Sequence, residues 1–247
     1  MSVVSRPSGG ASLLGGSIVL PPNECRHVLP PVTVSPWVGA PGTGGAVAVV
    51  GAGKMGLPVA AQFAGHGWRV IAVDVQETVV AAINEGRSHI GEEPGVAALV
   101  AAAHAGGRLR ATTDGMAAAR EADVVVLIVP VMLDADHQPD YAHMDAAVAS
   151  IGPGLHAGSL VIFETTLPVG DTRARYAPLL EAASGLRAEA DFGVAFSPER
   201  LYSGAALRNL STYPKLVGGL SAASTARAAA FYDSVLDAEI EIGRAHV

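Results

Sequence analysis

The stretch that most constrains this chain is residues 46–74, AVAVVGAGKMGLPVAAQFAGHGWRVIAVD. It opens with a short, valine-rich run, residues 46–50, that is typical of a buried strand. A GxGxxG turn at residues 51–56 and a helical pattern follow, and a second strand-like run, residues 69–73, ends at Asp74. Strand, glycine turn, helix, strand and acid in this order predict a dinucleotide-binding unit.

Each glycine of the turn has a separate physical reason to be there. Gly51 permits the tight turn out of the strand, Gly53 lets the backbone approach a pyrophosphate, and Gly56 lets the helix pack closely on the sheet. The pyrophosphate would lie on N–H groups at the positive end of that helix, beside Lys54 and Met55. We therefore expect all five of these residues to bind the cofactor.

Asp74 predicts which dinucleotide is bound. A carboxylate at the end of the second strand accepts hydrogen bonds from the adenosine ribose and repels a 2′-phosphate. Val75 and Gln76 follow it, so no arginine is present to hold that phosphate. The sequence therefore predicts NAD rather than NADP. A P-loop is excluded because Lys54 is followed by methionine rather than Ser or Thr.

Composition limits the partners. Hydrophobic residues make up 50% of the 247 residues and charged residues only 16%, which favours a large core with parallel strands. The net charge of −7 argues against nucleic acid as a partner. No apolar run is long enough to span a membrane, so no membrane partner is expected. The single cysteine, Cys25, cannot form a disulfide framework within the chain and fits a cytoplasmic location.

The sequence predicts a leader, one large domain and a short tail of ten residues at the end of the chain. Residues 1–45 are rich in Gly, Pro and Ser and are expected to form a disordered leader, in which Cys25 has no special role. Residues 46–237 alternate strand-like and helical patterns and predict an α/β domain with a doubly wound, mostly parallel, Rossmann-type sheet. The expected strands are 46–50, 69–73, 109–112, 123–129, 159–164, 192–196 and 215–217, and the expected helices are 56–64, 77–85, 96–105, 116–121, 141–151, 171–183 and 222–236.

Several segments that follow predicted strand ends resemble the nucleotide-sugar 6-dehydrogenases, a family that includes the UDP-glucose and UDP-N-acetylmannosamine enzymes. The resemblance covers residues 46 to about 236, and His89-Ile90 and SPER are closer to the N-acetylmannosamine branch. The matching segments, in order, are the glycine turn, INEGRSHIGEEPGV (83–96), Val129-Pro130, ETTLPVGDT (164–172), SPERLYSG (197–204) and KLVGG (215–219).

The resemblance implies an NAD-dependent, four-electron oxidation of a sugar C6 alcohol to a carboxylate, through a covalent intermediate on a cysteine. It implies that Thr166 holds the catalytic water beside the nicotinamide and that Glu199 acts in acid–base chemistry. It also implies that Val129 and Pro130 contact the cofactor. The partner would be a nucleotide sugar, and the full-length protein a homodimer. From the residues alone, Thr166 could be a loop hydroxyl and Glu199 a surface ion pair with Arg200.

The chain departs from the family pattern in several places. The family VPTP segment is Val129-Pro130-Val131-Met132 here, and Ser203 stands where the UDP-glucose branch has a second glutamate. Nothing after residue 219 matches the helical domain, the GGxC segment with the nucleophile, or the UDP-binding domain. Cys25 precedes the first strand and cannot replace the nucleophile.

The last ten residues, 238–247, are expected to be a non-native or truncated tail. EIGRAHV (241–247) is the translation of a G followed by the start of a widely used sequencing-adapter oligonucleotide. We therefore expect the natural reading frame to continue past residue 237, and we expect this chain to be the NAD-binding part alone, without turnover.

Other interpretations are kept beside this one. The glycine turn also resembles that of the β-hydroxyacid dehydrogenases, and a non-catalytic NAD-binding module is a further alternative. His137 and His143 lie near several aspartates but lack a metal-ligand spacing, so no metal site is predicted. The EEPG turn (92–95) is interpreted as structural and Lys215 as a lysine at the edge of a strand.

Overall fold

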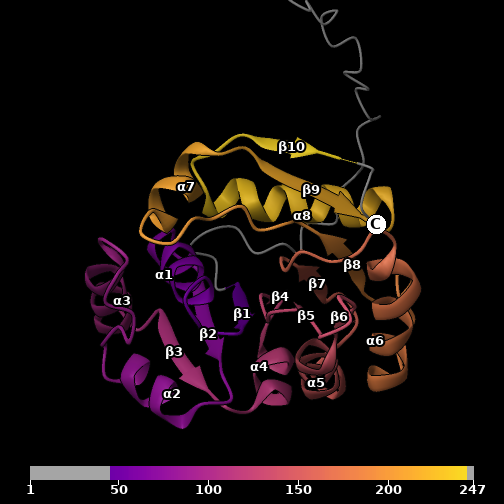
Figure 1. Cartoon of the computed structure of the whole chain (residues 1–247), viewed down its shortest axis with the longest axis horizontal. Helices are drawn as coiled ribbons and strands as arrows, with labels where there is room; N and C mark the ends of the chain where they lie inside the picture. The colour runs from indigo at the N-terminus through magenta and orange to yellow at the C-terminus, as the bar shows by residue number, and fades with distance from the viewer. Residues whose placement is uncertain (1–44, 244–247) are drawn as a thin grey trace, which may run out of the picture. The chain divides into compact units, whose positions relative to one another are not determined.

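The computed structural model describes residues 45–243, so the predicted leader with Cys25, up to residue 44, lies outside the described residues. The described part is built on an eight-stranded sheet in the order β10-β9-β8-β7-β4-β1-β2-β3 (Figure 1). Its strands are β1 (Ala46–Val50), β2 (Arg69–Val73), β3 (Leu109–Thr112), β4 (Val124–Leu127), β7 (Leu160–Phe163), β8 (Gly193–Phe196), β9 (Lys215–Gly219) and β10 (Ile240–Ile242).

Six neighbouring strands, from β3 across to β8, pair in parallel, and β9 then pairs antiparallel to β8. The doubly wound, mostly parallel α/β fold expected from the sequence is therefore confirmed. The sheet also extends past the predicted domain boundary at residue 237, because β10 pairs with β9 in the register Ile240↔Lys215. The non-native origin of residues 238–247 stays a prediction.

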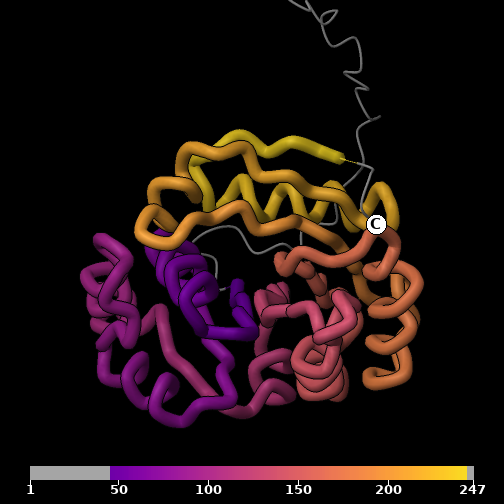
Figure 2. The backbone as a smooth tube through the Cα atoms, viewed as in Figure 1, coloured from indigo at the N-terminus to yellow at the C-terminus, as the bar shows by residue number. Residues whose placement is uncertain are grey.

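Helices cover both faces of the sheet, and the tube in Figure 2 follows the chain as it passes from one face to the other. The helices are α1 (Gly56–Gly65), α2 (Glu77–Asn84), α3 (Val96–Ala105), α4 (Gly115–Glu121), α5 (Ala142–Ile151), α6 (Ala177–Ser184), α7 (Ala206–Thr212) and α8 (Ala222–Val235). A π-helical turn, Thr172–Tyr176, leads into α6 where the sequence predicted one continuous helix.

A hydrophobic core lies on each face of the sheet, because the side chains of each strand alternate between the two faces. Val47 and Val49 of β1 pack on one face with α1, α3 and α8, whereas Ala48 and Val50 pack on the other with α4, α5 and α6. Successive side chains of a strand point to opposite faces, so a strand covered on both sides is apolar at every position. All five β1 residues are buried, as the continuous apolar run predicted.

Besides β10, two further features were not expected from the sequence. Helix α7 lies between the SPER loop and β9, and a small antiparallel ribbon joins β5 (Met132–Leu133) to β6 (Pro139–Asp140). The other helices and strands begin and end within a few residues of the predicted limits. Ser221 caps α8, since its hydroxyl accepts from the Ser224 N–H at 3.1 Å.

Candidate functional site

A cavity of about 720 Å³ opens at the carboxyl ends of β1, β2, β3, β4, β7 and β8. Ligands of open α/β sheets bind at this edge, and the volume lies within the usual range for small-molecule sites. Every site residue predicted from the sequence lines this one cavity: Gly51, Gly53, Lys54, Met55, Gly56, Asp74, Val129, Pro130, Thr166 and Glu199. The structure brings them together, and their individual roles remain predictions.

The glycine turn has the geometry that a dinucleotide site needs. Gly51 has a φ of +95°, which L side chains rarely adopt, and its N–H donates to the Val73 carbonyl at 2.8 Å. A Cβ on Gly56 would lie 1.7 Å from the Gly51 carbonyl oxygen, so helix α1 can approach the turn only with glycine there. A Cβ on Gly53 would meet no described atom within 4 Å beyond its chain neighbours, which leaves the cradle open for a phosphate.

The Asp74 carboxylate is fixed beside this turn. Its Oδ2 accepts from the Ala52 N–H at 3.0 Å and its Oδ1 from the Gln76 N–H at 2.9 Å. These two bonds hold the carboxylate at the mouth of the cavity, and each oxygen retains a lone pair for a ribose hydroxyl. The arrangement therefore fits the predicted preference for NAD.

Lys54 carries the positive charge at the turn. Its ammonium group lies 2.7 Å from the Glu92 carboxylate, and both side chains are largely exposed. The hydrogen bond to Glu92 raises the pKa of Lys54, so the lysine is charged at neutral pH. Glu92 is the first acid of the EEPG turn, which places that turn beside the phosphate cradle.

The second acid of the EEPG turn has a different partner. Glu93 is only 5% exposed, and its carboxylate accepts from the Gly204 N–H at 2.5 Å and the Ala206 N–H at 3.1 Å. It therefore caps the first turn of α7 from a distant part of the sequence. This confirms the structural role expected for the turn.

Thr166 lies on the loop that follows β7. Its neighbour Thr165 donates to the Val129 carbonyl at 2.6 Å, which ties this loop to the loop after β4. At the far end of the loop, the Tyr141 hydroxyl donates to the Asp171 carboxylate at 2.5 Å. The loop is thus held at both ends, with Thr166 at the cavity wall.

Glu199 lies on the loop after β8 and is half-buried. Burial raises the pKa of its carboxyl group; the Leu201 N–H and Lys215 lower it, whereas Glu164 raises it further. The net direction is upward. A carboxyl group whose pKa moves toward neutrality is suited to proton transfer.

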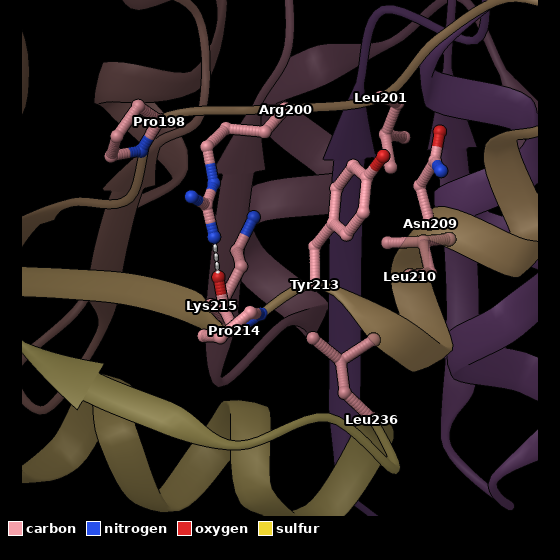
Figure 3. Close-up of a pocket in the computed structure, with 9 residues that line it drawn as sticks. All are labelled: Pro198, Arg200, Leu201, Asn209, Leu210, Tyr213, Pro214, Lys215 and Leu236. Atoms are coloured by element: carbon pink, nitrogen blue, oxygen red, sulfur yellow. Dashed lines mark hydrogen bonds between the residues drawn. The ribbon is translucent and has the colours of Figure 1, made fainter.

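The alternative of a surface ion pair between Glu199 and Arg200 is wrong. Arg200 instead donates to the Pro214 carbonyl, as the dashed line in Figure 3 shows. The Glu199 carboxylate accepts from the Leu201 N–H of its own loop. The two side chains therefore have separate partners, and Glu199 is left facing the cavity.

The prediction for Lys215 is also wrong. The lysine is only 8% exposed and its ammonium group lies 3.2 Å from the Glu164 carboxylate. It starts β9, which lies between β8 and β10 and is not an edge strand. The sequence pattern did not show this, because the acid that pairs with it is far away in the chain.

Several residues of the cavity wall were not predicted from the sequence. Thr113 follows β3, Thr165 precedes Thr166, and one face of α5 completes the wall. That face has helical i, i+3, i+4, i+7 spacing, which could have found it once α5 was known to flank the cavity. Its residues are His143, Ala146, Ala147 and Ser150.

Residues 45–243 contain no candidate metal site and no candidate membrane-spanning helix. No group of three or more His, Cys, Asp or Glu side chains in that range is placed to hold a metal ion, His137 and His143 included. Within the same range, every helix is too short or too polar to cross a membrane.

Comparison with known proteins agrees with this geometry. Residues 45–236 match the NAD binding domain of the UDP-glucose/GDP-mannose dehydrogenase family. The chain is 39% identical over 199 residues to UDP-N-acetyl-D-mannosamine dehydrogenase of Salmonella typhi, covering 78% of this chain and 46% of that protein. It is 37% identical to NDP-N-acetyl-D-galactosaminuronic acid dehydrogenase of Ralstonia solanacearum, covering 76% of this chain and 44% of that protein.

A solved structure is similar too. The UDP-D-ManNAc dehydrogenase of Pyrococcus horikoshii superimposes with a TM-score of 0.77 at 32% identity, covering 81% of this chain and 47% of that one. The chain therefore spans about half the length of the relatives it matches.

Proposed function

The chain belongs to the UDP-glucose/GDP-mannose dehydrogenase family, and from this premise we propose that it is the NAD-binding part of a nucleotide-sugar 6-dehydrogenase. One observation carries the proposal. A single cavity joins the glycine turn and Asp74, which suit a dinucleotide, to Thr166 and Glu199, which suit proton transfer. Because the chain belongs to this family, we do not propose the alternative function of a β-hydroxyacid dehydrogenase.

The residues that would hold NAD follow from the geometry. The open cradle at Gly53 and the N-terminus of α1 suit the pyrophosphate, with Lys54 supplying a positive charge. Asp74 suits the adenosine ribose. Val129, Pro130 and Thr166 suit the nicotinamide end, since they line the same cavity as Glu199. NAD, when bound, supplies the hydride acceptor.

Thr166 and Glu199 would manage the protons of the reaction. In our proposal the Glu199 carboxylate would accept the proton that the sugar C6 alcohol gives up on oxidation, directly or through a water held by Thr166. A raised pKa makes the carboxyl group a better base once it is deprotonated. The nucleophilic cysteine of this chemistry would belong to a part of the protein beyond this chain.

The finer assignments are also proposals. The N-acetylated UDP-sugars are the favoured substrates, since the two relatives are named for N-acetylated nucleotide sugars. The SPER segment also resembles the N-acetylmannosamine branch. We further propose a cytoplasmic enzyme that supplies uronic acids for polysaccharide synthesis and forms a homodimer through the remaining half of the protein.

The first test is calorimetric titration of this chain with NAD and with NADP. We expect saturable binding of NAD and at least tenfold weaker binding of NADP, a difference of about 1.4 kcal/mol in binding free energy. Gly53→Val is the matched variant, because its side chain fills the cradle while meeting no other described atom at Cβ. Equal affinity for both dinucleotides would overturn the assignment of Asp74.

The second test needs the complete natural chain, obtained by sequencing the source locus beyond codon 237. With UDP-N-acetylmannosamine we expect about two NADH per sugar oxidised, and a large loss of kcat in Glu199→Gln. A natural chain that binds NAD but oxidises no nucleotide sugar would make the protein a non-catalytic NAD-binding module.

A further inference from the structure

A buried cluster of charged and polar groups lies beneath the SPER loop and has no part in the proposed chemistry. Glu164, at the end of β7, is 1% exposed, and its Oε1 accepts from both the Lys215 ammonium group and the Tyr232 hydroxyl. Lys215 lies over the Tyr232 ring, 4.7 Å from its centre. Figure 3 shows the Lys215 side chain extending from the start of β9 beside Pro214.

This cluster is a poor device for stability alone. Its second oxygen, Glu164 Oε2, is buried and finds no hydrogen-bond partner among residues 45–243. A buried ion pair often stabilises a fold no better than apolar residues of the same size, and an incompletely bonded one does worse. The placement of these charges therefore calls for a reason other than folding.

Their location supplies that reason. The backbone carbonyl of Glu164 accepts from the Glu199 N–H at 2.8 Å. The Ser197 hydroxyl donates to the Leu216 carbonyl at 2.7 Å, which joins the start of the SPER loop to β9. Glu164 is also the residue immediately before Thr165 and Thr166. The same acid thus contacts the backbone of one proposed catalytic residue and lies two positions from the other.

Two charged groups act on the Glu199 carboxyl group from neighbouring elements. Glu164, at the end of β7, raises its pKa, and Lys215, on β9, lowers it. Tyr232 of α8 is wholly buried, and burial raises its pKa well above the usual value, so it stays neutral. On the loop itself Arg200 is turned toward Pro214, and the Leu201 N–H donates to the Glu199 carboxylate.

We propose that the buried Glu164–Lys215 pair is the positioning device of Glu199. Glu164 fixes its backbone, and the two buried charges act in opposite directions on the charge of its carboxyl group. Glu164 repels a charged Glu199, Lys215 attracts it, and Tyr232 holds Glu164 in place. Glu164 and Lys215 are positioning residues in this account, which rests on the proposed role of Glu199 in the reaction.

The test is a pH titration of the glutamate carboxyl carbons of this chain by ¹³C NMR, with Glu199→Gln to assign the signal. Glu164→Gln removes the repelling charge but keeps the acceptor for Lys215 and Tyr232, so the pKa of Glu199 falls. Lys215→Met removes the attracting charge, so the pKa of Glu199 rises. The two variants therefore shift the titration in opposite directions.

Controls separate this role from a structural one. Asp145→Asn disrupts the ion pair with Arg175, which is more exposed, and leaves the Glu199 titration unchanged. Tyr232→Phe keeps both charges and loses only the hydrogen bond to Glu164, so it covers the case in which Lys215→Met fails to fold. Its Glu199 signal moves less than that of Glu164→Gln.

Shifts in the same direction for both charge variants, or no shift in either, would overturn the proposal. The titration needs no turnover, so its result stands apart from the proposed function. Absence of NAD binding would remove the function and leave the charge balance intact, whereas an unresponsive Glu199 signal in a chain that binds NAD would remove only the positioning role.

Discussion

The two sides of the cavity are built by different means. The glycine-turn side, residues 46–74, is held by small residues, backbone hydrogen bonds and a buried valine strand. The acidic side, residues 197–219, is held by buried carboxylates that come from remote segments, Glu93 and Glu164. The comparison teaches that one half of the site is specified locally and the other by partners far away in the chain.

The largest expected effect comes from the local half. Gly56→Ala places a Cβ 1.7 Å from the Gly51 carbonyl oxygen, so α1 must move away from the sheet. We expect a loss of about 3 kcal/mol in the free energy of unfolding, at the upper end for overpacking. NAD binding should be lost as well. Urea unfolding and calorimetry measure the two effects.

Gly65→Ala is the matched control in the same helix, because its Cβ would meet no described atom within 4 Å. We expect unchanged or slightly higher stability, since alanine reduces the entropy of the unfolded chain. Equal losses in the two variants would show that α1 tolerates no substitution anywhere, and the close approach at Gly56 would then explain nothing.

The second-largest expected effect concerns the acidic side of the cavity, residues 197–219, which remote carboxylates hold in place. Glu93→Ala leaves the Gly204 N–H and the buried Ala206 N–H without their acceptor. We expect a loss of about 2 kcal/mol in stability and faster hydrogen exchange in α7, with the glycine turn unaffected. The adjacent Glu92→Ala, at an exposed position, should change neither. Exchange that rises equally in α1 would mean that the two halves are not independent.

Asp74→Asn addresses cofactor choice within the local half. The neutral side chain loses an acceptor for the ribose and no longer repels a 2′-phosphate, so NAD affinity should fall about tenfold and the preference over NADP should shrink. Glu77→Gln is the control, since Glu77 is a nearby exposed acid in the first turn of α2. If both variants lose NAD affinity alike, general electrostatics rather than Asp74 selects the cofactor.

The smallest effect belongs to Lys54. Lys54→Met should weaken NAD binding about threefold at low ionic strength and not at all at high salt, because an exposed charge is readily screened. Lys54→Arg keeps the charge and should bind normally. A loss that persists in high salt would indicate that Lys54 contacts the pyrophosphate closely, sharpening its predicted role.

The same contrast explains how much the sequence could predict. Short-range periodicity predicts the order of strands and helices and the glycine turn. The position of the cavity is predictable because ligands of such sheets bind where the parallel strands end. Helix α7 was missed because its cap, Glu93, comes from the EEPG turn, and no local N-cap residue marks its start. Lys215 was misplaced because a sequence pattern cannot show that Glu164 and Tyr232 surround it.

The strand order has a consequence for how this protein folds while it is synthesised on the ribosome. Within the eight-stranded sheet, each strand after β1 pairs with one that has already been synthesised: β2 and β4 pair with β1, β3 with β2, β7 with β4, β8 with β7, β9 with β8 and β10 with β9. No strand of this sheet after β1 has to wait for a later one before it can join. The nascent chain can therefore add strands outward from β1 in both directions, and β9 and β10 join last, on a sheet that is already folded.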